Sequence, residues 1–114
     1  MGRQSSHPLR MISEHEAGFT AYCACCGEFQ VSFGQLFLRL KQQDIATLTQ
    51  SLHISKNRNC CKVKTAQGVR HLLKTPHKEI LFSFTTAELN QFIDLMEETK
   101  LMVDAWGILG LNVK

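Results

Sequence analysis

The chain has 114 residues, of which 44% are hydrophobic and 20% charged, and its formal net charge at pH 7 is +3. This length suits one domain, and the composition excludes a collagen-like chain and a wholly disordered one. No apolar run approaches the roughly 18 residues of a membrane-spanning helix, and the N-terminal residues lack the apolar stretch of a secretory signal. We therefore expect a cytoplasmic protein without a membrane partner, in a compartment where thiols stay reduced.

The first residues are polar and aperiodic, so we expect a flexible tail over residues 1–16 and a single domain over residues 17–114. Strand character begins at residues 17–22. It resumes where Phe29, Val31 and Phe33 alternate with polar residues. At Gly34 the alternation slips by one residue, which predicts a β-bulge or a bend there, with residues 36–40 continuing the apolar alternation. Three more strands are expected at residues 60–65, 69–74 and 79–84, the first two joined by a turn at Gln67–Gly68.

Two segments have helical rather than strand periodicity. Apolar residues spaced by three and four positions predict a one-sided helix over residues 42–53. Thr85 and Glu88 have the spacing of a capping box, which marks the start of a second helix. We expect this helix to run to about Trp106 and to stop at Gly107.

The expected order is therefore β-β-α-β-β-β-α. Strands that follow one another in hairpins favour an α+β fold over an α/β fold. We expect an antiparallel sheet of four to five strands with two helices packed on one face. Residues 38–52 and 82–96 share one pattern of apolar and acidic positions. Either an internal duplication or any strand–turn–helix unit accounts for that pattern.

The five cysteines hold the main candidate site. Cys23 and Cys26 form a C-x-x-C pair followed by Gly27. In a zinc knuckle such a pair lies in a tight turn between strands, and a glycine after the second cysteine adopts the strained backbone angle. In a dithiol oxidoreductase the pair instead opens a helix, whose dipole lowers the pKa of the first thiol. A strand pattern follows here, so the context favours the knuckle.

A closed zinc site takes four ligands, and the sequence offers several candidates for the other two. Cys60 and Cys61 supply thiols, but adjacent residues on a strand point to opposite faces, so both join one site only if a turn forms there. The predicted zinc ligands are Cys23, Cys26, Cys60, Cys61 and His71, with His53, His15 or a water as alternatives for the last place. Cys25 is a bystander or an alternative ligand. Two other interpretations remain open, namely a Cu(I) site and a set of reduced, metal-free thiols.

Charge is unevenly distributed along the chain. Residues 45–78 contain no acidic residue but seven Lys and Arg residues, whereas the second predicted helix is acidic. A basic surface of this kind suits nucleic acid or another polyanion, but no nucleic-acid motif or aromatic residue accompanies it, so an exposed sheet face is favoured. A second apolar set on the C-terminal helix, at Leu95, Met102, Trp106 and Leu109, predicts a homodimer through that helix.

Enzyme signatures such as a phosphate-binding glycine loop, G-x-S-x-G or H-E-x-x-H are missing from the sequence. The sequence therefore favours a non-enzymatic interaction or adaptor module with a structural zinc knuckle. The alternative is a thiol-dependent redox protein or enzyme that uses the same cysteines.

One stretch carries a resemblance. Residues 22–40, Y-C-A-C-C-G-E-F-Q-V-S-F-G-Q-L-F-L-R-L, with D-I-A-T-L shortly after, resemble small uncharacterised bacterial proteins that carry C-x-x-C-G, an F-G turn, a leucine-rich strand and a helix. The motif is also similar to half of a zinc ribbon. The resemblance covers residues 22–52 and implies no known activity. A full zinc ribbon has a second C-x-x-C pair, which this sequence lacks.

Overall fold

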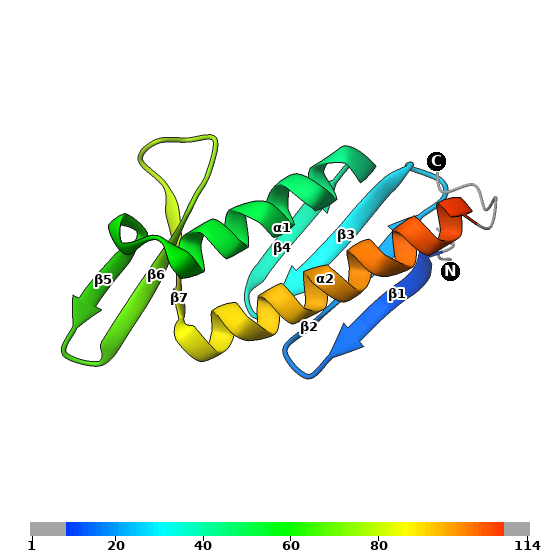
Figure 1. Cartoon of the computed structure of the whole chain (residues 1–114). Coiled ribbons are helices and arrows are strands. Elements are labelled where there is room, and N and C mark those ends of the chain that lie inside the picture. The colour runs from blue at the N-terminus through cyan, green and yellow to red at the C-terminus, as the bar shows by residue number, and fades with distance from the viewer. Residues whose placement is uncertain (1–8, 109–114) are drawn as a thin grey trace, which may run out of the picture.

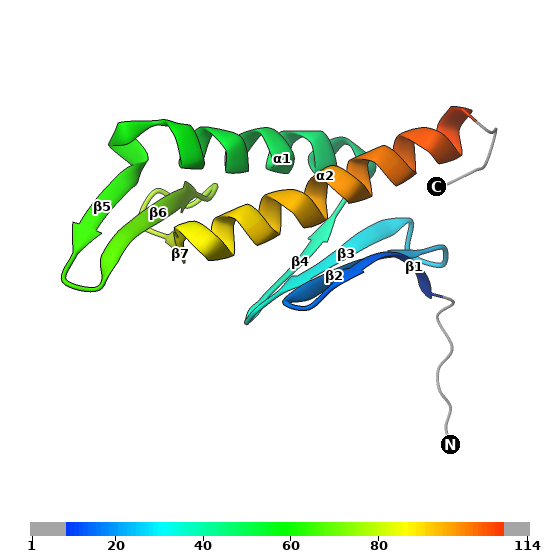
Figure 2. The ribbon, with the colours of Figure 1, turned by 60° about the horizontal axis from the view of Figure 1, so that its bottom comes forward.

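The computed structural model describes residues 9–108, which form two antiparallel sheets beneath a layer of two helices (Figures 1 and 2). The elements are β1 (Leu9–His15), β2 (Gly18–Cys23), β3 (Glu28–Phe33), β4 (Leu36–Leu40), α1 (Gln42–Asn57), the 3₁₀ turn η1 (Asn59–Cys61), β5 (Lys62–Thr65), β6 (Gly68–Lys74), β7 (Leu81–Thr85) and α2 (Thr86–Ile108). The α+β fold with antiparallel strands is thus confirmed.

Strand β1 lies in the stretch that the sequence analysis assigned to the N-terminal tail. It pairs with β2 along its length, with a register shift between Met11 and Ser13. This irregularity places both Ile12 and Ser13 in the interior, so no simple alternation of apolar and polar residues marks the strand. Residues 1–8, the remainder of the expected tail, lie outside the described residues.

The predicted bulge or bend at Gly34 is a hairpin turn. Phe33 pairs directly with Leu36, so Gly34 and Gln35 alone connect β3 to β4. Gly34 has a φ of +57°, a backbone conformation that tight hairpin turns require and glycine adopts without a steric penalty. The slip in alternation was therefore the turn itself, which returns the leucines of β4 to the same sheet face as Phe33.

The seven strands within residues 9–108 divide between two sheets, in the orders β1-β2-β3-β4 and β5-β6-β7, whereas one sheet is predicted from the sequence. Helix α1 carries the chain from one sheet to the other, because it continues from β4 and lies against β6.

Each helix packs mainly over the sheet that it does not directly follow. Helix α1 continues from β4 and lies against β6, whereas α2 continues from β7 and extends over β1 and β2 (Figure 2). An aromatic cluster closes the junction of the layers. Phe92 of α2 stacks on Phe33 with ring centroids 4.5 Å apart and meets Phe84 edge-on at 5.7 Å. The two segments with a shared sequence pattern are β4–α1 and β7–α2, which repeat one strand-to-helix connection.

The predicted start of α2 is confirmed and its predicted end is wrong. The Thr85 hydroxyl accepts from the Glu88 N–H at 3.1 Å, and the Glu88 carboxylate accepts from the Thr85 N–H at 2.8 Å, which is a capping box. Gly107 does not stop the helix, because it lacks a positive φ and α2 includes Ile108. Helix α1 also runs past its predicted end, to Asn57.

Polar side chains of α2 tie it to its neighbours. The hydroxyls of Thr20 and Thr99, both fully buried, lie 2.7 Å apart. Glu98 accepts hydrogen bonds from the Ser13 hydroxyl and from the His15 ring, and these two bonds, in that order, hold the pKa of its carboxyl below the ordinary value.

Candidate metal site at the turn between β2 and β3

The C-A-C-C-G segment forms the turn that joins β2 to β3. Cys23 is the last residue of β2 and pairs with Glu28, so residues 24–27 make the connection. Gly27 donates its N–H to the Cys23 carbonyl oxygen at 2.8 Å and has a φ of +70°. A glycine is suited to this left-handed position. The expected backbone of a knuckle, with a tight turn and a glycine after the second cysteine, is present.

The turn surrounds the Cys23 sulfur with hydrogen-bond donors. The Cys26 thiol, the Cys26 N–H and the Cys25 N–H donate to this sulfur and lower the pKa of the Cys23 thiol. The same bond raises the pKa of Cys26, because ionising Cys26 removes the proton that it shares with Cys23. A thiolate at Cys23 is therefore favoured over one at Cys26. The thiolate is the form in which cysteine binds metals and attacks electrophiles.

Cys23 and Cys26 line a hollow on the face of the first sheet that the helices do not cover, where Cys26 is exposed and Cys23 is buried, at 1% exposed. Phe29 points to the core, so its neighbours Glu28 and Gln30, together with Cys23 opposite Glu28, point to the outer face. Here a shallow hollow of about 390 Å³ is lined by Leu9, Cys23, Cys26, Gln30, Phe37 and Arg39.

Three large apolar side chains are exposed on this outer face: Leu9, Met11 and Phe37, each about half exposed. The sequence analysis did not single them out. Phe37 carried a signal, since it is an apolar residue between the inward-facing leucines of β4 and thus on the face expected to be polar. We call Leu9, Met11 and Phe37 the outer apolar patch.

Cys60 and Cys61 lie in η1 rather than at the start of a strand. The turn brings their two sulfur atoms to 4.0 Å from each other. Both thiols can therefore face the same site, as the sequence analysis required of a turn at this position. Cys61 is buried, and burial raises the pKa of its thiol. A pocket of about 250 Å³ adjoins the two thiols and includes Arg58 and Lys74.

His71 links three elements of the fold. Its Nδ1 lies 3.3 Å from the Ser55 carbonyl oxygen and its Nε2 lies 2.8 Å from the Thr86 hydroxyl oxygen. A neutral ring that donates from Nδ1 and accepts at Nε2 satisfies both contacts. With both nitrogens engaged, the ring has no lone pair directed at a metal. His53 and His15 contact the carboxylates of Glu97 and Glu98, each at 2.6 Å.

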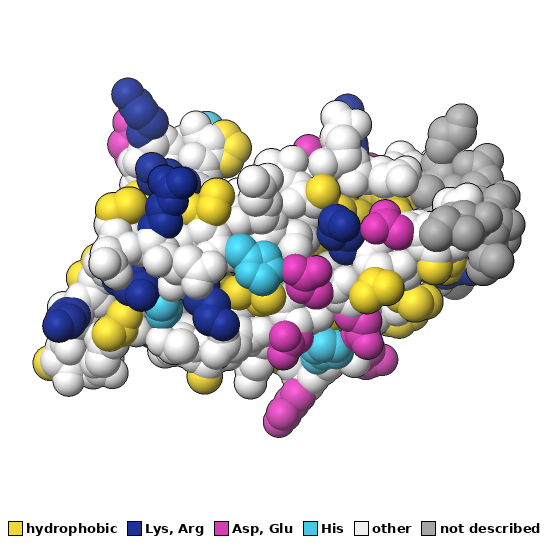
Figure 3. Space-filling model, viewed as in Figure 1, with side chains coloured by type: hydrophobic (Ala, Val, Ile, Leu, Met, Phe, Trp, Pro, Cys, Tyr) yellow, Lys and Arg dark blue, Asp and Glu magenta, His cyan; other side chains and the backbone are white. Residues whose placement is uncertain are grey.

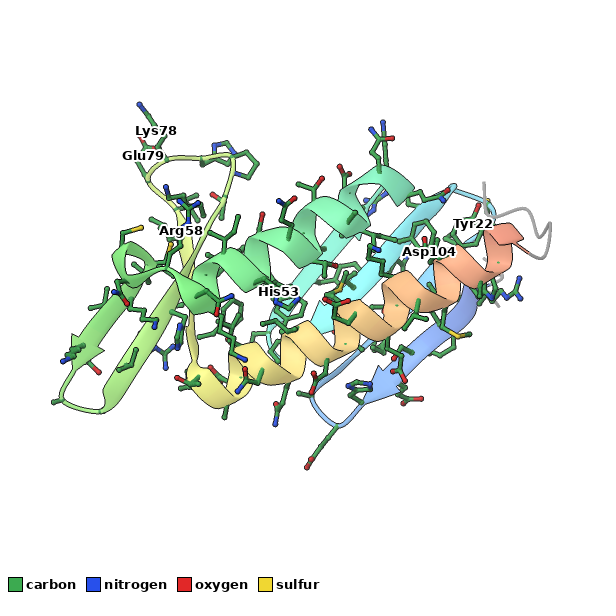
Figure 4. All side chains as sticks on the ribbon, in the orientation of Figure 1. Tyr22, His53, Arg58, Lys78, Glu79 and Asp104 are labelled. Atoms are coloured by element: carbon green, nitrogen blue, oxygen red, sulfur yellow. The ribbon has the colours of Figure 1, made fainter. Side chains whose placement is uncertain are left out.

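The predicted ligands are not brought to one place. Tyr22, which precedes the first cysteine turn, and Arg58, which precedes η1, lie at opposite ends of the molecule (Figure 4). Within residues 9–108, no three side chains of His, Cys, Asp or Glu are grouped as a metal site would need. Cys23 and Cys26 therefore form half of a ligand set, and the staple to Cys60, Cys61 or His71 does not form within the described chain.

The second apolar set on α2 is mostly internal. Leu95 is fully buried and Trp106 is 5% exposed, whereas Met102 is 39% exposed. Leu109 lies outside the described residues. Leu95 and Trp106 therefore pack in the chain's own core. They are not available on the surface of α2 that was predicted to form a dimer.

Charges follow the predicted distribution. Lys and Arg side chains gather at the end formed by β5 and β6, and acidic side chains lie along α2 (Figure 3). No described helix combines the length and apolar character needed to cross a membrane.

Comparison with known proteins gives a family but no activity. Residues 6–105 match the model described as "Family of unknown function (DUF6686)", and the chain belongs to this family. No curated protein and no solved structure matches the chain.

Proposed function

We propose that this family member is a non-catalytic interaction module whose Cys23 and Cys26 bind a zinc ion. The observation that supports the proposal is the turn itself. Two cysteines spaced for one metal ion lie beside each other, backbone N–H groups point at the Cys23 sulfur, and a left-handed glycine closes the turn. Zinc prefers such sulfur ligands, and N–H donors stabilise the thiolates that it needs.

The zinc ion requires more ligands than the described chain supplies. Structural zinc sites are tetrahedral and closed, and the turn provides two of the four ligands. A binding partner that supplies the remaining ligands makes the ion part of an interface, which suits an interaction module rather than an internal metal site.

The rival function is thiol–disulfide exchange at the same pair. The lowered pKa of Cys23 and the raised pKa of Cys26 suit an attacking thiolate and a resolving thiol. In that reaction the Cys23 thiolate attacks a partner disulfide and displaces one thiolate. Cys26 then attacks the mixed disulfide, giving a Cys23–Cys26 disulfide and a reduced partner. The zinc proposal is preferred because a strand, not a helix, follows the pair.

Metal analysis of the freshly purified, reduced protein separates the two functions. We expect zinc in the wild type, its loss in Cys26→Ser, and unchanged content in the matched control Cys60→Ser. Zinc retained in Cys26→Ser, or a metal-free wild type with one rapidly alkylated thiol at Cys23, would contradict the proposal.

A further inference from the structure

The zinc half-site lies next to the outer apolar patch, on the face of the first sheet away from the helices. Leu9 and Phe37 line the same hollow as Cys23 and Cys26. Leu9 is the pairing partner of Cys23 across β1 and β2, so its side chain points to the same face. The proposed two-thiol metal site and the exposed apolar area thus coincide at one place.

We propose that a second copy of this chain completes the site, so that Cys23 and Cys26 from each of two chains hold one zinc ion. This inference rests on the proposed function. A two-fold axis through the metal brings identical half-sites together, and two C-x-x-C turns supply the four thiolates of a closed site.

Apolar burial favours the same arrangement. Leu9, Met11 and Phe37 are 51%, 52% and 52% exposed in the single chain. Two copies that meet over the metal bring both patches into the contact, because Leu9 and Phe37 line the same hollow as the cysteine pair. Burial of exposed apolar area stabilises the contact by roughly 25 cal/mol per Å² before the costs of association, so metal and patch act together.

The surface has polar residues where a rim is expected. Arg39 borders the hollow, and its guanidinium pairs with the Glu28 carboxylate at 2.9 Å. The two charges therefore neutralise each other within one chain, and neither needs an opposite charge from the second copy. An apolar centre around a metal, with a polar rim, has the anatomy of a specific interface.

Light scattering of the full-length protein during a zinc titration tests the inference. We expect a metal-free monomer to become a dimer with a midpoint at about one zinc ion per two chains, and a chelator to reverse the change. Cobalt in place of zinc is expected to bind in the same ratio, with the absorption of a four-thiolate tetrahedral site. These wild-type measurements do not depend on any variant folding correctly.

Variants locate the interface. Phe37→Glu keeps all four thiolates and is expected to raise the protein concentration needed for half-dimerisation by about tenfold or more. The matched control, Leu101→Glu, alters a residue of α2 that is 70% exposed. It is expected to leave the dimer unchanged, and its disruption instead would assign the interface to the helix and overturn the inference.

The stoichiometry separates failure of this inference from failure of the proposed function. One zinc ion per monomeric chain, lost in Cys26→Ser, overturns the second copy while the zinc function stands. No zinc in any state overturns both proposals.

Discussion

The buried hydroxyl pair of Thr20 and Thr99 offers a direct measure of how β2 holds α2. Thr99 donates its hydroxyl proton to the Leu95 carbonyl oxygen at 2.8 Å, so Thr20 is the donor in the 2.7 Å contact between the two threonines. Thr99→Val leaves the Thr20 proton buried without an acceptor, which costs about 1–3 kcal/mol. Thr20→Val leaves the Thr99 proton bonded to Leu95 and costs only about 1 kcal/mol.

The double variant removes both hydroxyls and leaves no buried donor unsatisfied. We therefore expect its free energy of unfolding to fall by about 1 kcal/mol less than the sum of the two single changes. Urea denaturation followed by fluorescence measures this, because Trp106 is the chain's one tryptophan and is 5% exposed. Single changes that add to within about 0.3 kcal/mol would refute a coupling through this hydrogen bond.

Three further predictions concern the fold. Because the pKa of Glu98 is lowered in the folded protein, its ionised form stabilises the fold above the ordinary pKa of 4.5, and this contribution disappears as the pH falls through the lower folded value. Glu98→Gln is therefore expected to flatten the dependence of the free energy of unfolding on pH in acid. An unchanged dependence would contradict this. A Cβ added to Gly18 would lie 2.1 Å from the Ser32 carbonyl oxygen, so Gly18→Ala should destabilise the protein by about 2 kcal/mol or more. Gly107→Ala, where the added Cβ meets open space, should leave the stability unchanged. Equal melting temperatures of the two variants would contradict the close approach of Gly18 to Ser32. The Tyr22 hydroxyl is buried without a hydrogen-bond partner among the described residues, so Tyr22→Phe is expected to match or exceed wild-type stability in urea denaturation, and a loss above about 1 kcal/mol would reveal a missed partner.

Local periodicity predicted most of the elements, because burial on one face leaves a direct trace in the sequence. Phe29, Val31 and Phe33 alternate and are all nearly fully buried, and the capping box at Thr85 formed as expected. Gly34 shows the limit of such patterns. A one-residue slip in alternation is equally compatible with a bulge and with a two-residue turn, and only the partner strand distinguishes them.

Division into two sheets was beyond the reach of local patterns. It depends on where the 16-residue helix α1 ends and on how α2 extends back over β1 and β2. Both are set by long-range packing. Likewise, the spacing of Cys23 and Cys26 predicted the turn, but no spacing shows that Arg58, which precedes η1, lies at the opposite end of the molecule from Tyr22, which precedes the turn (Figure 4). The sequence therefore predicted the turn that holds one cysteine pair, and it could not show where the other candidate ligands lie.

Native mass spectrometry of the freshly purified protein tests the zinc site most directly, because it counts chains and metal ions in the same particle. We expect a dimer that carries one zinc ion and that separates into metal-free monomers when Cys26 is changed to serine. A metal-free wild type, or a zinc-loaded particle that persists in Cys26→Ser, would contradict the claim that Cys23 and Cys26 hold the metal.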